Sequence, residues 1–201
     1  MTAIAEIMTL SPVIPVLVID DVARAEPIAR ALVAGGVRAL EVTLRTPAAF
    51  DAIAAMKRVP GAVVGAGTVL NRADLNAAIV AGAEFVVSPG LTADLGEAAV
   101  ASGVPFLPGV ASPSDLMRGL DLGLTHFKFF PAEANGGIAA MKALTGPFPM
   151  ARFCPTGGIT AASARDWLAL DAVLCVGGSW LVPRGEPDSA AITAAGRAAT
   201  R

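Results

Sequence analysis

Lys128 has the most unusual surroundings of the three lysines in this chain. It lies in the run His126-Phe127-Lys128-Phe129-Phe130, where aromatic neighbours would deprive its ammonium group of water. Desolvation favours the neutral amine, which is the form that attacks a ketone to make a Schiff base. The alternative is a lysine that extends from a strand end to pair with an acid. Lys57 and Lys142 lie in helical patterns, where solvated surface positions are expected.

Glu41 and Arg45 are a second pair of residues whose spacing suggests chemistry. They are four positions apart in a predicted strand, so they share one face, while Leu40 and Val42 lie on the other. We expect Glu41 to point into the interior beside Lys128, and Arg45 to stand at the rim. A carboxylate beside a buried lysine can relay protons. A buried ion pair without a catalytic role would contain the same residues.

Two glycine pairs follow the last two predicted strands: Gly157-Gly158 after Pro155-Thr156, and Gly177-Gly178 before Ser179. Glycines at such turns expose backbone N–H groups, which bind a phosphate without a cationic side chain. In barrels of parallel strands, the loops after strands seven and eight form the phosphate site. Simple turn glycines are the alternative. The separate run Gly65-Ala66-Gly67-Thr68 lacks the third glycine of a dinucleotide-binding motif, so it does not indicate a nucleotide cofactor.

Short β-branched runs alternate with alanine-rich helical runs along the chain. The predicted strands are Val13–Ile19, Arg38–Leu44, Val63–Val69, Phe85–Ser88, Phe106–Val110, His126–Phe130, Arg152–Thr156 and Val173–Val176. The predicted helices include Val22–Ala34, Pro47–Arg58, Arg72–Ala81, Ala93–Ser102 and Pro113–Leu122. Gly36, Gly82, Gly103 and Gly123 fit the position after a helix, where a left-handed backbone is needed.

This alternation predicts an α/β protein, and eight strands within 201 residues predict a compact (β/α)8 TIM barrel. A doubly wound open sheet is the alternative. The barrel is favoured because an open sheet covered by helices should be apolar on both faces, whereas Glu41, Thr43 and Arg45 make one face polar. We predict one domain over residues 1–201, with a leading helix in 1–11. A C-terminal helix within 184–201 would begin at Pro187-Asp188.

The composition excludes several functional classes. Hydrophobic residues make up 54% of the chain, which excludes a disordered protein. A net charge of −2 without clustered Lys and Arg gives no electrostatic reason for a nucleic-acid or anionic-membrane partner. One His and two Cys provide neither a two-histidine zinc site nor a disulfide framework, so no metal is expected. We expect a cytoplasmic protein, because no long apolar segment or basic leader is apparent.

Motifs shared with one known family are spread from about Pro12 to Pro183. They are EVTLRT at 41–46, GAGTV at 65–69, SPG at 88–90, FLPGV at 106–110, KFFPAE at 128–133, PTGGI at 155–159 and VGGSW at 176–180. In this order and spacing the chain resembles the 2-keto-3-deoxy-6-phosphogluconate (KDPG) aldolases. These include bifunctional forms that also act on 4-hydroxy-2-oxoglutarate (KHG).

The resemblance implies a class I aldolase that uses no metal or cofactor. Lys128 would form a Schiff base with the substrate ketone, and Glu41 would move the protons. Arg45 and Thr68 would hold the carboxylate of the pyruvate half. The other implied contacts are Pro89 and Phe130 as pocket walls, Thr156 at the substrate hydroxyls, and Gly157, Gly158, Gly178 and Ser179 at the distal phosphate. The expected substrate is KDPG, a phosphorylated keto acid cleaved to pyruvate and glyceraldehyde 3-phosphate, and the expected assembly is a homotrimer.

Two other functions stay open. The first is a relative that acts on the galactonate epimer, or chiefly on KHG. Thr156 favours the gluconate form, because family members selective for the epimer tend to be apolar at that position. The second is a non-catalytic phosphosugar-binding barrel, which would have no need to bury Lys128 beside Glu41.

Overall fold

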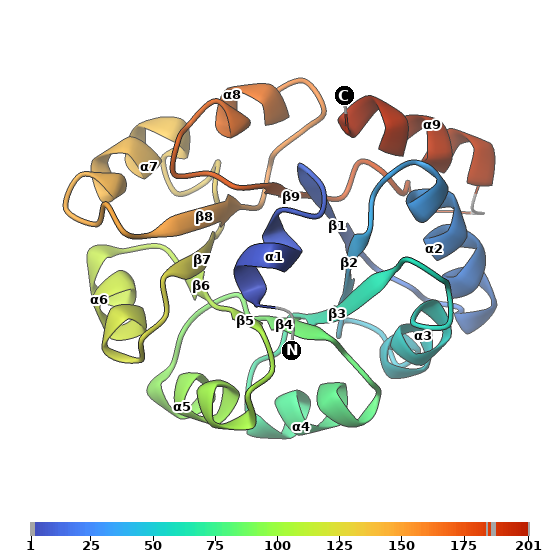
Figure 1. Ribbon diagram of the computed structural model, residues 1–201, viewed down its shortest axis with the longest axis horizontal. Coiled ribbons are helices and arrows are strands. Elements are labelled where there is room, and N and C mark those ends of the chain that lie inside the picture. Colours follow the sequence, from blue (N-terminus) through green and yellow to red (C-terminus); the bar gives the residue numbers. More distant parts are fainter. Residues whose placement is uncertain (1–2, 184, 186–187, 201) are drawn as a thin grey trace.

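The computed structural model describes residues 3–183, 185 and 188–200. Figure 1 shows strands that curl around a central axis, with most helices outside them. Pro187, which is predicted to help begin the last helix, lies outside the described residues. Asp188 does cap that helix, because its side chain accepts hydrogen bonds from the backbone N–H groups of Ala190 and Ala191.

Strands and helices alternate along most of the chain. The strands are β1 (Val13–Leu17), β2 (Ala39–Thr43), β3 (Val63–Gly67), β4 (Phe85–Val87), β5 (Phe106–Leu107), β6 (Gly109–Val110), β7 (His126–Phe129), β8 (Arg152–Pro155) and β9 (Val176–Gly178). The helices are α1 (Ile4–Met8), the short 3-10 helix η1 (Val22–Arg24), α2 (Ala25–Ala34), α3 (Ala49–Met56), α4 (Arg72–Val80), α5 (Ala93–Ser102), α6 (Pro113–Asp121), α7 (Gly137–Thr145), α8 (Ala164–Leu168) and α9 (Ser189–Ala199). No helix in the described part of the chain is long and apolar enough to cross a membrane.

Hydrogen bonding divides the parallel strands into two sheets. One has the order β5-β4-β3-β2-β1-β9, and the other has the order β6-β7-β8. The last strand pairs with the first, Val176 opposite Val13, which a doubly wound sheet would not do. Isolated bridges, Phe153 with Val173 and Thr156 with Gly177, join β8 to the last strand segment. The structure therefore confirms the α/β class and shows parallel strands curled into part of a barrel.

The predicted fifth strand, Phe106–Val110, is interrupted at Pro108. Proline has no backbone N–H and so cannot donate to a neighbouring strand. The carbonyl of Pro108 accepts a hydrogen bond from the backbone N–H of Lys128 at 2.8 Å. β5 pairs with β4, whereas β6 pairs with β7. The single sheet expected from the sequence is thus split at this proline.

The predicted eighth strand is displaced toward the C-terminus. Its β-branched residues predict Val173–Val176, but β9 covers Val176–Gly178. Gly177 and Gly178, expected in a loop, lie in the strand because the side chains of Thr156 and Trp180 occupy the space that their own side chains would fill. Close approach of another part of the chain is a common reason for glycine inside a strand.

The helix ends agree with the glycine pattern. Gly36, Gly82, Gly103 and Gly123 have φ angles of +89°, +90°, +71° and +76°, so each adopts the predicted left-handed conformation. α5 has the predicted bounds, Ala93–Ser102.

Apolar side chains form two clusters, and the larger one lies between the strands and the outer helices. It includes Leu40 and Val42 of β2, together with Ile28 and Leu32 of α2. These two β2 side chains lie on the face predicted for them, opposite Glu41. Burial of such side chains supplies the main driving force for folding.

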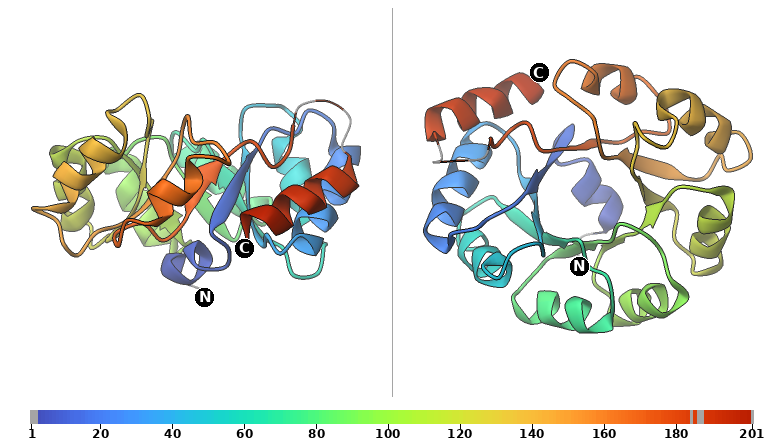
Figure 2. Two further views of the ribbon diagram at one scale, coloured as in Figure 1. Left: turned by 90° about the horizontal axis from the view of Figure 1, so that it is seen from above. Right: turned by 180° about the vertical axis from the view of Figure 1, so that it is seen from behind.

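The smaller cluster fills the interior of the curled strands. It includes Phe85, Cys154 and Cys175, and it also contains Ile7 and Met8 from α1. Ile7 is 1% exposed and Met8 is fully buried. Figures 1 and 2 show α1 lying across one end of the curled strands. The leading helix therefore covers the interior at the end where β1 begins.

Candidate active site

Lys128 and Glu41 face each other inside the curled strands. Lys128 is on β7 and Glu41 is on β2, and Nζ lies 3.3 Å from Oε1. Only 7% of the lysine side chain and 4% of the glutamate side chain are exposed. Water screens such an ion pair poorly, and either partner alone would be a costly buried charge. The lysine ammonium also lies 5.2 Å from the centre of the Phe130 ring, within the range of a cation–π contact.

Glycines on β3 make room for the buried carboxylate and for a neighbouring aromatic ring. Glu41 is paired in register with Gly65 on β3. A methyl group on Gly67 would overlap the Glu41 carboxylate, and one on Gly65 would overlap the ring of Phe85. Sequence reasoning assigned no role to Gly67. The available signal was a glycine inside a strand, which marks a close approach of another group.

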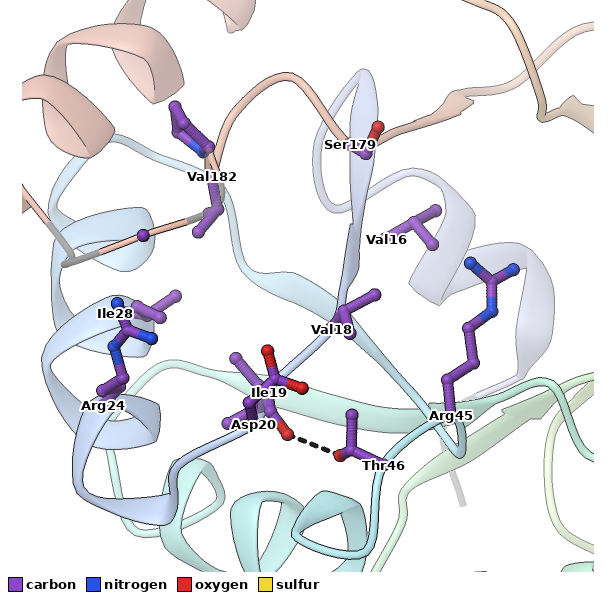
Figure 3. Close-up of a pocket in the computed structure, with 12 residues that line it drawn as sticks. Val16, Val18, Ile19, Asp20, Arg24, Ile28, Arg45, Thr46, Ser179 and Val182 are labelled. Atoms are coloured by element: carbon purple, nitrogen blue, oxygen red, sulfur yellow. Dashed lines mark hydrogen bonds between the residues drawn. The ribbon is translucent and has the colours of Figure 1, made fainter.

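Arg45 lies just beyond β2, so the prediction that it continues the strand face of Glu41 is wrong. β2 ends at Thr43, and Leu44 and Arg45 form a turn. The hydroxyl of Thr46 donates a hydrogen bond to the carbonyl of Ile19 at 2.5 Å, which ties the turn to the chain after β1. Figure 3 shows the Arg45 guanidinium directed away from this turn, along the wall of a cavity.

This cavity, of about 600 Å³, opens where β1, β2 and β9 end. Arg45 and Ser179 line it, together with Asp20, Arg24 and Val16. In barrels of parallel strands, ligands bind at this end of the strands. Sequence reasoning missed Asp20 and Arg24, because charged residues after a strand look like ordinary solvated positions.

The two glycine pairs have different backbone conformations. Gly157 and Gly158, in the loop after β8, have φ angles of +104° and +82°, a conformation that glycine adopts without strain. Gly178 lies inside β9 with the Trp180 ring packed over it, so the second pair is not the predicted loop. Ser179 follows at an exposed position. The loop after β9 therefore begins at Ser179.

The remaining predicted pocket residues follow strand ends. Thr68, after β3, has a φ of +61°, which is uncommon for a residue other than glycine and recurs at functional sites. Pro89, after β4, has its carbonyl so close to Gly109 that a side chain there would collide with it. Thr156 is buried after β8, and Gly177 leaves the space that its hydroxyl occupies. Pro89 and Thr156 are thus each packed against a glycine of a neighbouring strand.

The cysteines and the histidine are buried or half-buried. Both Cys154 and Cys175 are free thiols. A hydrogen bond with Cys154, burial and the nearby Glu41 carboxylate together raise the pKa of the Cys175 thiol well above its ordinary value. Burial, and then the positive charge of Arg152, lower the pKa of His126. The described residues contain no group of three or more His, Cys, Asp or Glu side chains that could hold a metal ion.

Glu133 and Trp167 form a contact that sequence reasoning missed. Trp167, expected only to fill volume, is 1% exposed, and its Nε1 donates a hydrogen bond to Glu133 Oε1 at 2.9 Å. No sequence signal joins a residue in the turn after β7 to a residue of α8, 34 positions further on.

The fold and the site define a class of protein: an α/β enzyme of curled parallel strands, with a buried lysine–carboxylate pair inside the strands and a cavity lined by Arg45 at the strand ends. The family model for KDPG and KHG aldolase matches residues 4–195. The chain belongs to this aldolase family.

Its relatives resemble it over nearly their full length. The 2-dehydro-3-deoxy-phosphogluconate aldolase of Zymomonas mobilis is 61% identical over 200 residues, covering 100% of this chain and 96% of that protein. The KHG/KDPG aldolase of Escherichia coli K12 is 58% identical over 183 residues, covering 90% of this chain and 86% of that protein. The crystal structure of KDPG aldolase from Legionella pneumophila, with pyruvate captured at low pH as a covalent carbinolamine intermediate, matches with a TM-score of 0.96. It is 46% identical and covers 100% of this chain and 99% of that chain.

Proposed function

We propose that this protein is a class I aldolase that cleaves KDPG to pyruvate and glyceraldehyde 3-phosphate. A second activity would be the cleavage of KHG to pyruvate and glyoxylate. The observation that carries the proposal is the buried contact of 3.3 Å between Lys128 Nζ and Glu41 Oε1. The printed names of the relatives, at 61% and 58% identity, support the same reaction.

Lys128 is the nucleophile in this scheme. Transfer of an ammonium proton to Glu41 frees the amine to attack the C2 ketone, which gives a carbinolamine and then, with loss of water, an iminium ion. Glu41, through a water molecule, takes the proton of the C4 hydroxyl as the C3–C4 bond breaks. The electrons of that bond reduce the iminium to an enamine, and the aldehyde leaves. Protonation at C3 and hydrolysis release pyruvate and restore the lysine.

The other residues orient the substrate and keep water out. Arg45 and Thr68 hold the carboxylate next to the ketone, while Pro89 and Phe130 form the pocket walls. Thr156 contacts the substrate hydroxyls. The distal phosphate binds at the strand ends, where its partners are Gly157, Gly158, Gly178 and Ser179. Gly178 is inside β9, so its part is to bring the backbone close, and Ser179 begins the loop.

The proposal extends to the architecture, assembly and location of the protein. The two curled sheets would work as one eight-stranded barrel, with residues 1–201 as a single domain. We expect it to act in the cytoplasm as a homotrimer, with the small-molecule keto acid and pyruvate as its ligands. The iminium is the electron sink in this scheme, so no metal or other cofactor is needed.

Two alternatives lead to different measurements. An aldolase for the galactonate epimer would prefer 2-keto-3-deoxy-6-phosphogalactonate, and the hydroxyl of Thr156 speaks against it. A non-catalytic phosphosugar-binding barrel would bind KDPG without cleaving it. The buried Lys128–Glu41 pair speaks against that module, because apolar residues of similar size would give the same fold at less cost.

Borohydride reduction in the presence of pyruvate tests the proposal. The wild-type chain should gain one reduced pyruvyl group, detected by intact mass and mapped to Lys128 by peptide analysis. Lys142 is exposed on α7 and provides the matched control, so Lys142→Ala should be labelled like the wild type. Full labelling of Lys128→Ala would refute the assignment, and loss of turnover with excess chelator would point to a metal enzyme.

A further inference from the structure

Glu133 lies where two loops of the proposed site meet. Its backbone N–H donates a hydrogen bond to the carbonyl of Gly157 at 3.1 Å, and the N–H of Ala132 donates to the carbonyl of Thr156 at 2.8 Å. The chain after β7, which begins only two residues after Lys128, therefore runs alongside the loop after β8.

The side chain of Glu133 packs against the second glycine of that loop. A methyl group on Gly158 would come within 2.7 Å of both Cβ and Cγ of Glu133, so the glutamate stem covers the bare Cα. Gly158 has a φ of +82°, a conformation that glycine adopts without strain. Glycine is also the residue whose backbone moves most freely, and the glutamate restricts this movement from one side.

Trp167 fixes the carboxylate of Glu133. The indole is buried, and its N–H donates to Glu133 Oε1 at 2.9 Å. The ring centre of Trp167 lies 6.3 Å from that of Phe129, at the end of β7. A buried indole N–H needs an acceptor, and the Glu133 side-chain oxygen supplies it. The glutamate is thus anchored to α8 while its stem touches the loop.

We propose that Glu133, held by Trp167, is a positioning residue that fixes the Gly157–Gly158 loop relative to Lys128. This inference rests on the proposed aldolase function, in which the loop binds the phosphate and the lysine attacks the ketone. Both ends of one substrate must be held at a fixed separation. Because Glu133 continues the segment that carries Lys128, its contacts set that separation.

Four variants test the inference. Glu133→Ala removes the stem and the acceptor, Glu133→Gln keeps both, and Trp167→Phe removes the indole N–H while keeping an aromatic ring. Glu97→Ala, at an exposed position on α5, is the matched control. Each is compared on KDPG and on 2-keto-3-deoxygluconate, which lacks the phosphate. Inorganic phosphate serves as a competitive inhibitor, and thermal unfolding shows that each variant is folded.

We expect Glu133→Ala to lower kcat/KM for KDPG by about 10- to 100-fold, mainly through KM, because small displacements of a positioned group cost this much. Phosphate should inhibit it more weakly, while kcat/KM for 2-keto-3-deoxygluconate and exchange of the pyruvate methyl protons stay unchanged. Trp167→Phe should show a smaller decrease in kcat/KM for KDPG. Glu133→Gln and Glu97→Ala should have the wild-type kcat/KM.

Other outcomes overturn the inference. Equal losses of Glu133→Ala on both substrates and in proton exchange would show a merely structural role. An unchanged preference of Glu133→Ala for KDPG over 2-keto-3-deoxygluconate would show that Glu133 does not position the Gly157–Gly158 loop. If the wild type has the same kcat/KM for both substrates, the phosphate site of the proposed function is refuted together with the inference. Borohydride labelling of Lys128 tests the aldolase reaction separately.

Discussion

Gly67 lies against the carboxylate of Glu41 on the neighbouring strand, so closely that a methyl group on its Cα would overlap Oε1. The bare backbone of β3 at this position therefore forms one wall of the space that holds Glu41. On its other side the same oxygen lies 3.3 Å from Lys128 Nζ. The position of the Glu41 carboxylate thus depends on the lack of a side chain at Gly67 on the adjacent strand.

Replacement of Gly67 with alanine should displace Glu41 and lower turnover of KDPG. We expect a loss of about 100-fold in kcat, since a shift of about 1 Å in a catalytic group has an effect of this size. Lys128 is untouched, so borohydride trapping of pyruvate should persist in part. Steady-state kinetics and intact mass measure the two effects.

Gly146, after α7, provides the control for this substitution. A methyl group there would lie 3.7 Å from the carbonyl of Ala143, an ordinary contact. Gly146→Ala should therefore keep wild-type turnover. If Gly67→Ala and Gly146→Ala have the same kcat, the contact with Glu41 is not what the reaction requires.

Glu41→Gln should separate proton transfer from folding. The substitution keeps the shape of the side chain and removes the base, so kcat should fall by about 10²- to 10⁴-fold. Exchange of pyruvate methyl protons with deuterated water should slow in parallel, because enamine formation uses the same base. Turnover assays and NMR follow both quantities.

A counter-ion role for Glu41 predicts a different result. The free energy of unfolding would then fall by about 3–5 kcal/mol, because Lys128 would be left as an orphaned buried charge. Urea unfolding distinguishes the two roles. A well-folded Glu41→Gln protein with near-normal turnover and exchange would place the base elsewhere.

Removal of the phosphate from the substrate should lower catalytic efficiency by orders of magnitude. Binding energy at this remote group orients the reacting carbon, so part of the loss should appear in kcat. Ser179→Ala should reduce the gap between KDPG and 2-keto-3-deoxygluconate, because Ser179 begins the loop after β9. A gap of the same size in Ser179→Ala would remove this serine from the phosphate site.

His126 should make stability depend on pH in the acid range. Burial and Arg152 lower the pKa of His126 in the folded protein, so the unfolded chain takes up a proton before the folded one does. The contribution is fully present above about pH 6.5, the ordinary pKa of histidine, and is lost as pH falls through the lowered folded value. Urea unfolding between neutral and acid pH should show a smaller loss for His126→Gln. Parallel curves for the two proteins would contradict this assignment.

Local signals in the sequence predicted much of the fold correctly. The bounds of α5 and the left-handed glycines after helices follow from residues within one turn of the chain. The placement of Leu40 and Val42 against the outer helices follows from the period of two in a strand. The inward direction of Glu41 follows from the same alternation. In the structure, Glu41 Oε1 lies 3.3 Å from Lys128 Nζ.

The features that sequence reasoning missed depend on contacts between distant parts of the chain. Gly178 looks like a loop residue until the ring of Trp180 is seen packed on it. The missing N–H of Pro108 matters only because β5 and β6 pair with different strands. Glu133 and Trp167 are 34 residues apart, and neither residue type predicts a contact with the other. The turn at Arg45 likewise depends on a hydrogen bond to the chain after β1.

The helix α1 has a kinetic consequence. Because Ile7 and Met8 fill the interior where the strands begin, ligands of the proposed reaction would enter from the other end of the strands. In the proposed scheme the pyruvate half stays covalently attached to Lys128 after the bond breaks, whereas the phosphorylated aldehyde would be bound without a covalent link. The aldehyde must therefore leave first and pyruvate second, so in the reverse direction pyruvate binds before glyceraldehyde 3-phosphate.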